Sequence, residues 1–90
     1  TEKEAALIYA EEKVKTLEDL DEEQKETLYV MQQAKVFSNK NLSINALMQN
    51  LECSRGKMLR LLDSLESKGY ITADKQHKPY KYILNEQFFA

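Results

Sequence analysis

Glycine and proline are so scarce in this chain that most of it must be helical. The 90 residues contain two glycines and one proline, whereas folds built from many hairpins need such residues at most of their turns. Hydrophobic residues make up 42% of the chain and charged residues 31%, which is typical of a globular domain and argues against disorder. We expect one helix-dominated domain, because 90 residues leave little room for a second.

The first half of the chain predicts two helices separated by a short acidic break. Apolar residues at helical spacing indicate one helix over residues 2–18 and another from 22 to about 37. Asp21 directly precedes the second helix, and Gln24 stands three residues after Asp21, which is the spacing of a capping box.

The second half predicts a close pair of helices. Ser43 can cap a short helix over residues 44–51, and Ser54 can cap a helix over 55–68. Gly69 then stands where glycine commonly ends a helix.

A β-hairpin follows this pair. Residues 70–73 and 80–84 are rich in β-forming side chains and flank a polar turn. The expected fold is therefore mostly α with a small β-hairpin, in an α+β arrangement preceded by an N-terminal helix.

The N-terminal helix carries a narrow apolar seam of the coiled-coil type. Its members are Leu7, Ala10, Val14 and Leu17. The seam can pair two copies of the chain as a homodimer, or it can pack back on its own domain. We accordingly divide the chain into residues 1–20, for dimerisation or as a linker, and a domain over residues 21–90.

Residues 42–71 resemble the winged helix-turn-helix of MarR-type and related bacterial regulators. The resemblance needs no gap and, with the hairpin as the wing, covers about half the chain. The matching residues are Leu42, Ser43, Leu47, Leu51, Ser54, Arg55, Arg60, Leu61, Leu62, Leu65, Glu66, Gly69, Tyr70 and Ile71. Three positions depart from the family pattern: Met48 replaces a small residue, Glu52 a turn glycine, and Gly56 a polar residue in the recognition helix.

The resemblance implies double-stranded DNA as the partner, with the helix over 55–68 in the major groove and the hairpin as a basic wing. The expected DNA contacts are Ser54, Arg55, Gly56, Lys57 and Arg60 in the helix, and Lys75, His77, Lys78 and Lys81 in the wing. Arg55 can form the bidentate contact to guanine, while Lys57 or Arg60 can hold phosphate or a base.

The charge distribution agrees with an anionic partner although the whole chain carries −2. Residues 1–26 have a net charge of −6, whereas residues 55–82 have seven bases against three acids. Local charge governs the approach of a polyanion. The alternative is that the acidic helix and the basic hairpin are both simply solvated.

Other functional classes find little support in the sequence. One cysteine and one histidine do not make a recognisable metal site, and we find no nucleophile motif, phosphate loop or paired carboxylates. We expect a cytoplasmic non-enzyme without cofactor or metal, and no membrane association, since no apolar run or signal peptide is visible.

Two functions remain open. The first is a transcriptional regulator that binds duplex DNA as a dimer. The second is a winged-helix module of a larger replication, helicase or chromosome-organising protein, which binds DNA non-specifically or docks a protein partner. A contiguous exposed patch of Leu59, Met48, Phe88 and Phe89 would favour the second.

Overall fold

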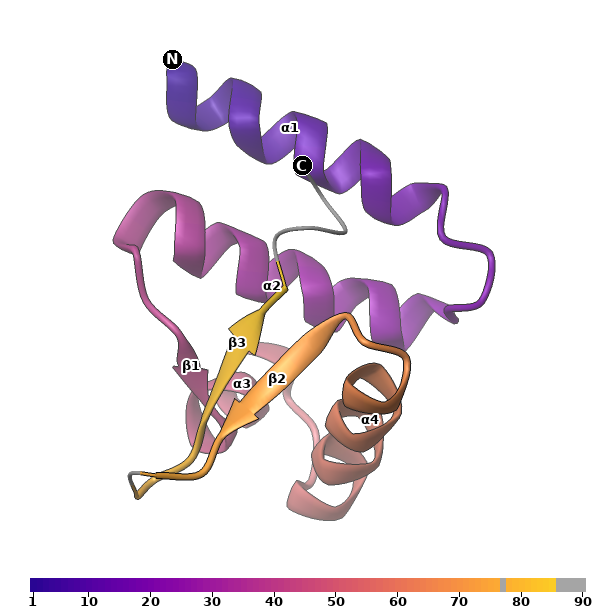
Figure 1. Cartoon of the computed structure of the whole chain (residues 1–90), viewed down its shortest axis with the longest axis vertical. Coiled ribbons are helices and arrows are strands. Elements are labelled where there is room, and N and C mark those ends of the chain that lie inside the picture. Colours follow the sequence, from indigo (N-terminus) through magenta and orange to yellow (C-terminus); the bar gives the residue numbers. More distant parts are fainter. Residues whose placement is uncertain (77, 86–90) are drawn as a thin grey trace.

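The computed structural model describes residues 1–76 and 78–85. Figure 1 shows the order of the elements along the chain. They are α1 (Glu2–Lys15), α2 (Glu22–Ser38), β1 (Leu42–Ser43), α3 (Ile44–Leu51), α4 (Arg55–Ser67), β2 (Ile71–Asp74) and β3 (Lys81–Leu84). All four helices that the sequence predicts are present, with α1 three residues shorter than the predicted 2–18.

The predicted caps begin three of these helices. Asp21 accepts a hydrogen bond from the backbone N–H of Gln24, and the Gln24 side chain accepts one in return, which completes the capping box of α2. The Ser43 and Ser54 hydroxyls cap α3 and α4 by each accepting one hydrogen bond from the backbone N–H three residues later. Gly69 follows Lys68, the C-cap residue of α4, and has a φ of 87°. This left-handed conformation is the one in which glycine commonly ends a helix, as the sequence predicts.

A left-handed residue also makes the turn between α3 and α4. Glu52 ends α3 with a φ of 51°, at one of the positions where the sequence departs from the pattern that it resembles. A side chain with a Cβ adopts this conformation at a cost. The turn therefore has a conformation that favours glycine, although a glutamate stands there.

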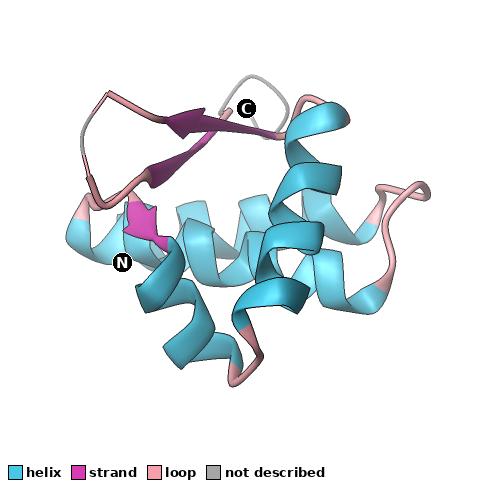
Figure 2. Cartoon of the chain, turned by 90° about the horizontal axis from the view of Figure 1, so that it is seen from below, coloured by secondary structure: helices cyan, strands magenta, loops and turns pink. Residues whose placement is uncertain are grey.

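A three-stranded antiparallel sheet, and not a hairpin alone, lies across one side of the helices (Figure 2). The central strand, β3, pairs with β2 through Ile71 opposite Leu84 and with β1 through Leu42 opposite Tyr82. The sequence analysis predicted β2 and β3 but missed β1. Two residues cannot show the alternation of a strand, so β1 is defined only by its tertiary pairing with β3.

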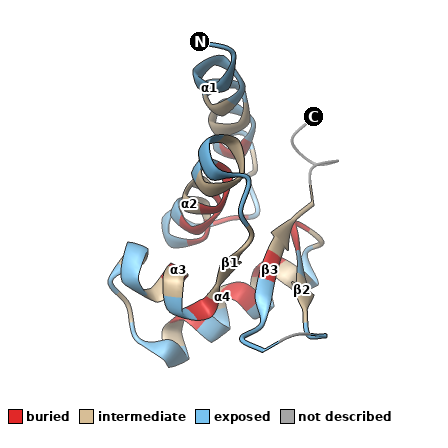
Figure 3. Ribbon diagram, turned by 90° about the vertical axis from the view of Figure 1, so that its left-hand side faces the viewer, coloured by how far each residue is buried: buried red, intermediate tan, exposed pale blue. Residues whose placement is uncertain are grey.

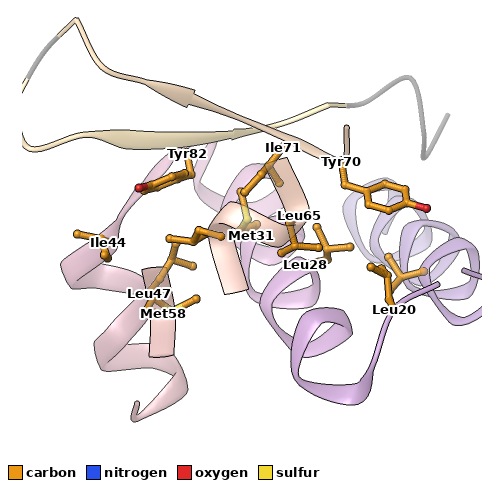
Figure 4. Packing of buried hydrophobic residues seen from close by; sticks show 12 residues of the cluster. Leu20, Leu28, Met31, Ile44, Leu47, Met58, Leu65, Tyr70, Ile71 and Tyr82 are labelled. Atoms are coloured by element: carbon orange, nitrogen blue, oxygen red, sulfur yellow. The ribbon is translucent and has the colours of Figure 1, made fainter. Parts of the chain in front are cut away.

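The core lies where α2, α3, α4 and the sheet meet (Figure 4). Its buried apolar members are Val14, Leu20, Leu28, Met31, Ile44, Leu47, Met58, Leu62, Leu65, Tyr70, Ile71 and Tyr82. Burying one leucine fully stabilises the fold by roughly 1.5–3 kcal/mol. Figure 3 shows buried segments on the sides of the helices and sheet that face one another. This packing fixes α4 relative to β2 and β3.

Helix α1 lies against α2, on the side of α2 that faces away from α3 and α4 (Figure 1). Val14 of α1 is fully buried there, and the Gln32 side chain of α2 donates a hydrogen bond to the Ala10 carbonyl at 3.4 Å. The N-terminal helix is thus placed far from the tip of the hairpin.

Candidate nucleic-acid interface

Helix α4 presents a polar, basic ridge to solvent. Its apolar side is taken up by the core, and Arg55, Gly56 and Arg60 are exposed on the other side. A Cβ added at Gly56 would meet no atom within 4 Å. The first turns of α4 are therefore open to a large partner, at the end of the helix that normally reaches base edges.

The hairpin is held in a fixed orientation beside α4. The backbone N–H of Ala73 in β2 donates a hydrogen bond to the Glu66 carboxylate of α4 at 2.9 Å. After β3, the Asn85 side chain donates to the Gly69 carbonyl at 2.8 Å, and its backbone N–H donates to the Tyr70 carbonyl at 2.9 Å. These bonds anchor both strands to the end of α4.

Three of the predicted wing contacts, Lys75, Lys78 and Lys81, are exposed in the hairpin. The fourth, His77, lies outside the described residues. Within residues 1–76 and 78–85, these three lysines, Arg55 and Arg60 form no ion pair. Their charges are therefore available to an anionic partner.

Lys57 is the predicted contact that the structure places differently. It lies in the first turn of α4, about 200° around the helix from Arg55, and its ammonium forms an ion pair with the Glu23 carboxylate of α2. The hydrogen bond and the negative charge of Glu23 raise the pKa of Lys57 above its ordinary value. Lys57 is therefore charged, but an acid of its own chain already neutralises it.

A groove of about 390 Å³ separates the first turns of α4 from the hairpin. It is lined by Ile44, Asn45, Arg55, Leu59, Lys78, Pro79, Tyr80 and Tyr82. Leu59 and Tyr80 are 36% and 38% exposed. The groove brings one predicted contact of the helix, Arg55, together with one of the wing, Lys78.

The N-terminal seam faces its own chain. Val14 is fully buried and Leu17 packs against the core, whereas Leu7 and Ala10 are partly exposed. Val14 and Leu17 therefore pack within their own chain. Ile8, on the outer side of α1, is 59% exposed.

The apolar patch considered for a protein partner is not assembled among the described residues. Leu59 is exposed on α4, but Met48 packs against the core from α3. Phe88 and Phe89 lie outside the described residues. A patch of these four residues is therefore not a basis for choosing between the two functions.

Sequence reasoning missed Asn45 and Tyr82 in the groove and Glu23 beside Lys57. The alternation of β3 predicts which side Tyr82 faces, but only the tertiary structure shows what lies there.

Among the described residues, no group of His, Cys, Asp and Glu side chains is arranged to hold a metal ion, and no helix has the length and apolarity needed to cross a membrane. Comparison of the chain with family models, with curated proteins and with solved structures finds no match.

Proposed function

We propose that this domain binds double-stranded DNA, with α4 in the major groove and the β2–β3 hairpin on the flanking backbone or minor groove. The groove that brings Arg55 of α4 beside Lys78 of the hairpin is the observation that carries this proposal. It unites two separate segments into one basic surface, as duplex binding requires.

The order of the elements supports the same proposal. Helices α3 and α4 are joined by a three-residue turn, and an antiparallel hairpin follows α4 and pairs with β1. This is the arrangement expected of a winged helix-turn-helix, in which the second helix reads DNA and the hairpin is the wing. Arg60 stands on the exposed ridge of α4, where it can reach a base edge or a phosphate.

The simplest biological setting is a transcriptional regulator that acts as a dimer. Val14 is fully buried against α2, so pairing of two copies would need a surface other than Val14. The outer side of α1, which exposes Ile8, is free for this.

A salt titration tests the proposal directly. Fluorescence anisotropy with a labelled random-sequence duplex should give binding that weakens as salt rises from about 50 to 200 mM. Five basic side chains of the interface form no ion pair among the described residues. If each of them neutralises one phosphate, the slope of log K against log salt is about −4.5, and affinity falls about 500-fold over that range.

Variants locate the bound face. Lys78→Ala should weaken binding to all sequences alike and make the salt slope smaller by about one. Lys3→Ala is a matched control, because Lys3 is an exposed lysine on α1, on the far side of α2 (Figure 1). Equal effects of the two substitutions would show that the assigned face is wrong.

A module of a larger protein that docks a protein partner is the alternative function. The exposure of Leu59 and Tyr80 in the groove is the observation that favours it. Absence of DNA binding even at low salt would support this alternative, and the groove would then be the first surface to test against protein partners.

A further inference from the structure

Tyr82 combines a mostly buried ring with a hydroxyl that forms no hydrogen bond to any residue the structure describes. The residue lies on β3 and is only 7% exposed. Figure 4 shows its hydroxyl on the side of Ile44, which lines the groove between α4 and the hairpin together with Tyr82. Within residues 1–76 and 78–85 this hydroxyl forms no hydrogen bond.

The hydroxyl is a hydrogen-bond donor at any physiological pH. Burial raises the pKa of Tyr82 above its ordinary value of 10.0, Asp63 and Glu66 act in the same direction, and Arg55 acts against them. A protonated phenol can donate one hydrogen bond. In the free protein this hydroxyl reaches the water of the groove, and a ligand oxygen that replaces the water gains a direct bond from a donor that the packing of the ring already holds in place.

Positive charge surrounds the same groove. Arg55 and Lys78 line it from opposite sides, and neither forms an ion pair among the described residues. Ile44 and Asn45, the first two residues of α3, line it as well. Their backbone N–H groups have no acceptor within the helix, and the N-terminal end of a helix attracts anions. No acidic residue occurs in the first turn of α3 or α4.

The remaining lining is apolar and partly exposed, contributed mainly by Leu59 of α4 and by Pro79 and Tyr80 of the hairpin. The ligand that fits the whole groove must carry a negative charge with several acceptor oxygens next to a face of C–H groups. A phosphodiester joined to deoxyribose has this combination.

We propose that the groove binds the sugar–phosphate backbone of one DNA strand. The Tyr82 hydroxyl donates a hydrogen bond to a phosphate oxygen, and Arg55 and Lys78 neutralise its charge. The adjoining deoxyribose lies against Leu59 and Tyr80. This inference rests on the proposed binding of duplex DNA, and it assigns Arg55 to the backbone and not to guanine.

The geometry of duplex DNA requires a surface of this kind. The major and minor grooves are separated by one strand of the backbone. If α4 enters the major groove and the hairpin tip reaches the neighbouring minor groove, that strand passes between them. The groove between α4 and the hairpin lies where this strand must run, and direct contacts there position the domain without reading sequence.

Tyr82→Phe tests the inference, because it removes the hydroxyl and keeps the ring that packs in the core. The assay is anisotropy of the 90-residue chain with a labelled 20-bp random-sequence DNA duplex at several salt concentrations. A hydrogen bond to a charged group is strong, so affinity should fall about tenfold. The salt slope should stay the same, because no charge is lost. Arg55→Gln, in contrast, should make the slope smaller by about 0.9.

Tyr29→Phe is the matched control. Tyr29 lies on α2 and is not part of the groove, so its hydroxyl should not affect affinity. Thermal unfolding of each variant checks that the fold is kept, and Tyr82→Phe breaks no hydrogen bond of the described chain.

Each outcome decides a separate point. A tenfold loss with Tyr82→Phe alone, at constant slope, supports the groove as a backbone site. Unchanged affinity of Tyr82→Phe, or equal losses in Tyr82→Phe and Tyr29→Phe, overturns the inference and leaves the proposed DNA binding in place. Absence of binding by the unmodified chain at about 50 mM salt, where phosphate contacts are strongest, overturns the proposed function and the inference with it.

Discussion

The ion pair between Glu23 and Lys57 predicts that one substitution strengthens DNA binding, whereas most substitutions at a binding surface weaken it. The Glu23 carboxylate of α2 forms an ion pair with the Lys57 ammonium in the first turn of α4. Without this partner the ammonium would be free to contact a phosphate. Substituting Glu23→Gln removes the competing charge without changing the size of the side chain. We therefore expect this variant to bind DNA more tightly than the unmodified chain.

The size of the gain follows from counterion release. One additional phosphate contact makes the slope of log K against log salt steeper by about 0.9. If the variant and the unmodified chain bind equally at about 1 M salt, this difference in slope gives the variant about eightfold higher affinity at about 0.1 M salt. Because the pair is exposed to solvent, its loss should change the stability of the fold little.

Glu22→Gln is the control for this experiment. Glu22 and Glu23 are neighbouring acids in the first turn of α2, so both substitutions remove one negative charge and the same favourable interaction with the helix dipole. Of these two acids, only Glu23 forms an ion pair within the described residues. Anisotropy across salt should show a steeper slope for Glu23→Gln alone. Equal slopes for the two variants would refute a role for Lys57 in phosphate binding.

Two further predictions concern the stability of the fold. Val14→Ala should lower the free energy of unfolding by about 1–3 kcal/mol in urea titrations, because Val14 is fully buried between α1 and α2. Ile8→Ala, on the outer side of α1, is the control and should change the free energy of unfolding by less than about 0.5 kcal/mol. A Val14→Ala effect that depends on protein concentration would contradict packing within one chain. Burial, followed by the hydrogen bond to Asp19 at 3.0 Å, raises the pKa of Tyr70 above 10.0. The folded state therefore holds this proton more tightly, so its stabilising contribution is present below pH 10 and is lost as pH rises through the folded pKa. Tyr70→Phe should cost about 1 kcal/mol at neutral pH and should flatten the fall in stability above about pH 10; an unchanged alkaline profile would contradict this assignment.

Local chemistry accounts for the parts of the fold that the sequence predicts well. Helix starts depend on one side chain and the backbone three residues later, as at Asp21 and Ser54, and such pairs are visible in the sequence. The apolar spacing of Met58, Leu62 and Leu65 likewise predicts the buried side of α4. These features need no knowledge of the rest of the chain.

The features that the sequence could not predict all depend on contacts between distant segments. Strand β1 exists because Leu42 pairs with Tyr82. The Glu23–Lys57 ion pair joins α2 to α4, and neither residue has a local pattern that identifies the other. Arg55 is exposed in the first turn of α4, but its position beside the hairpin follows only from the packing of α4 on the sheet.

The fold also explains how a chain with a net charge of −2 can present a basic surface. The acids concentrate in residues 1–26, and six of the ten lie in residues 18–26, in the loop before α2 and the first turns of α2, at the end of α2 away from the hairpin tip (Figure 1). The molecule measures 33 × 27 × 23 Å, and the Debye length is about 10 Å at 0.1 M salt. A polyanion that binds the hairpin tip is therefore screened from most of these acids at that salt concentration. At about 0.01 M the Debye length grows to about 30 Å, comparable with the whole molecule, and the acids of residues 18–26 then oppose binding. The affinity of this domain for DNA should for this reason rise less steeply below about 0.05 M salt than phosphate contacts alone would require.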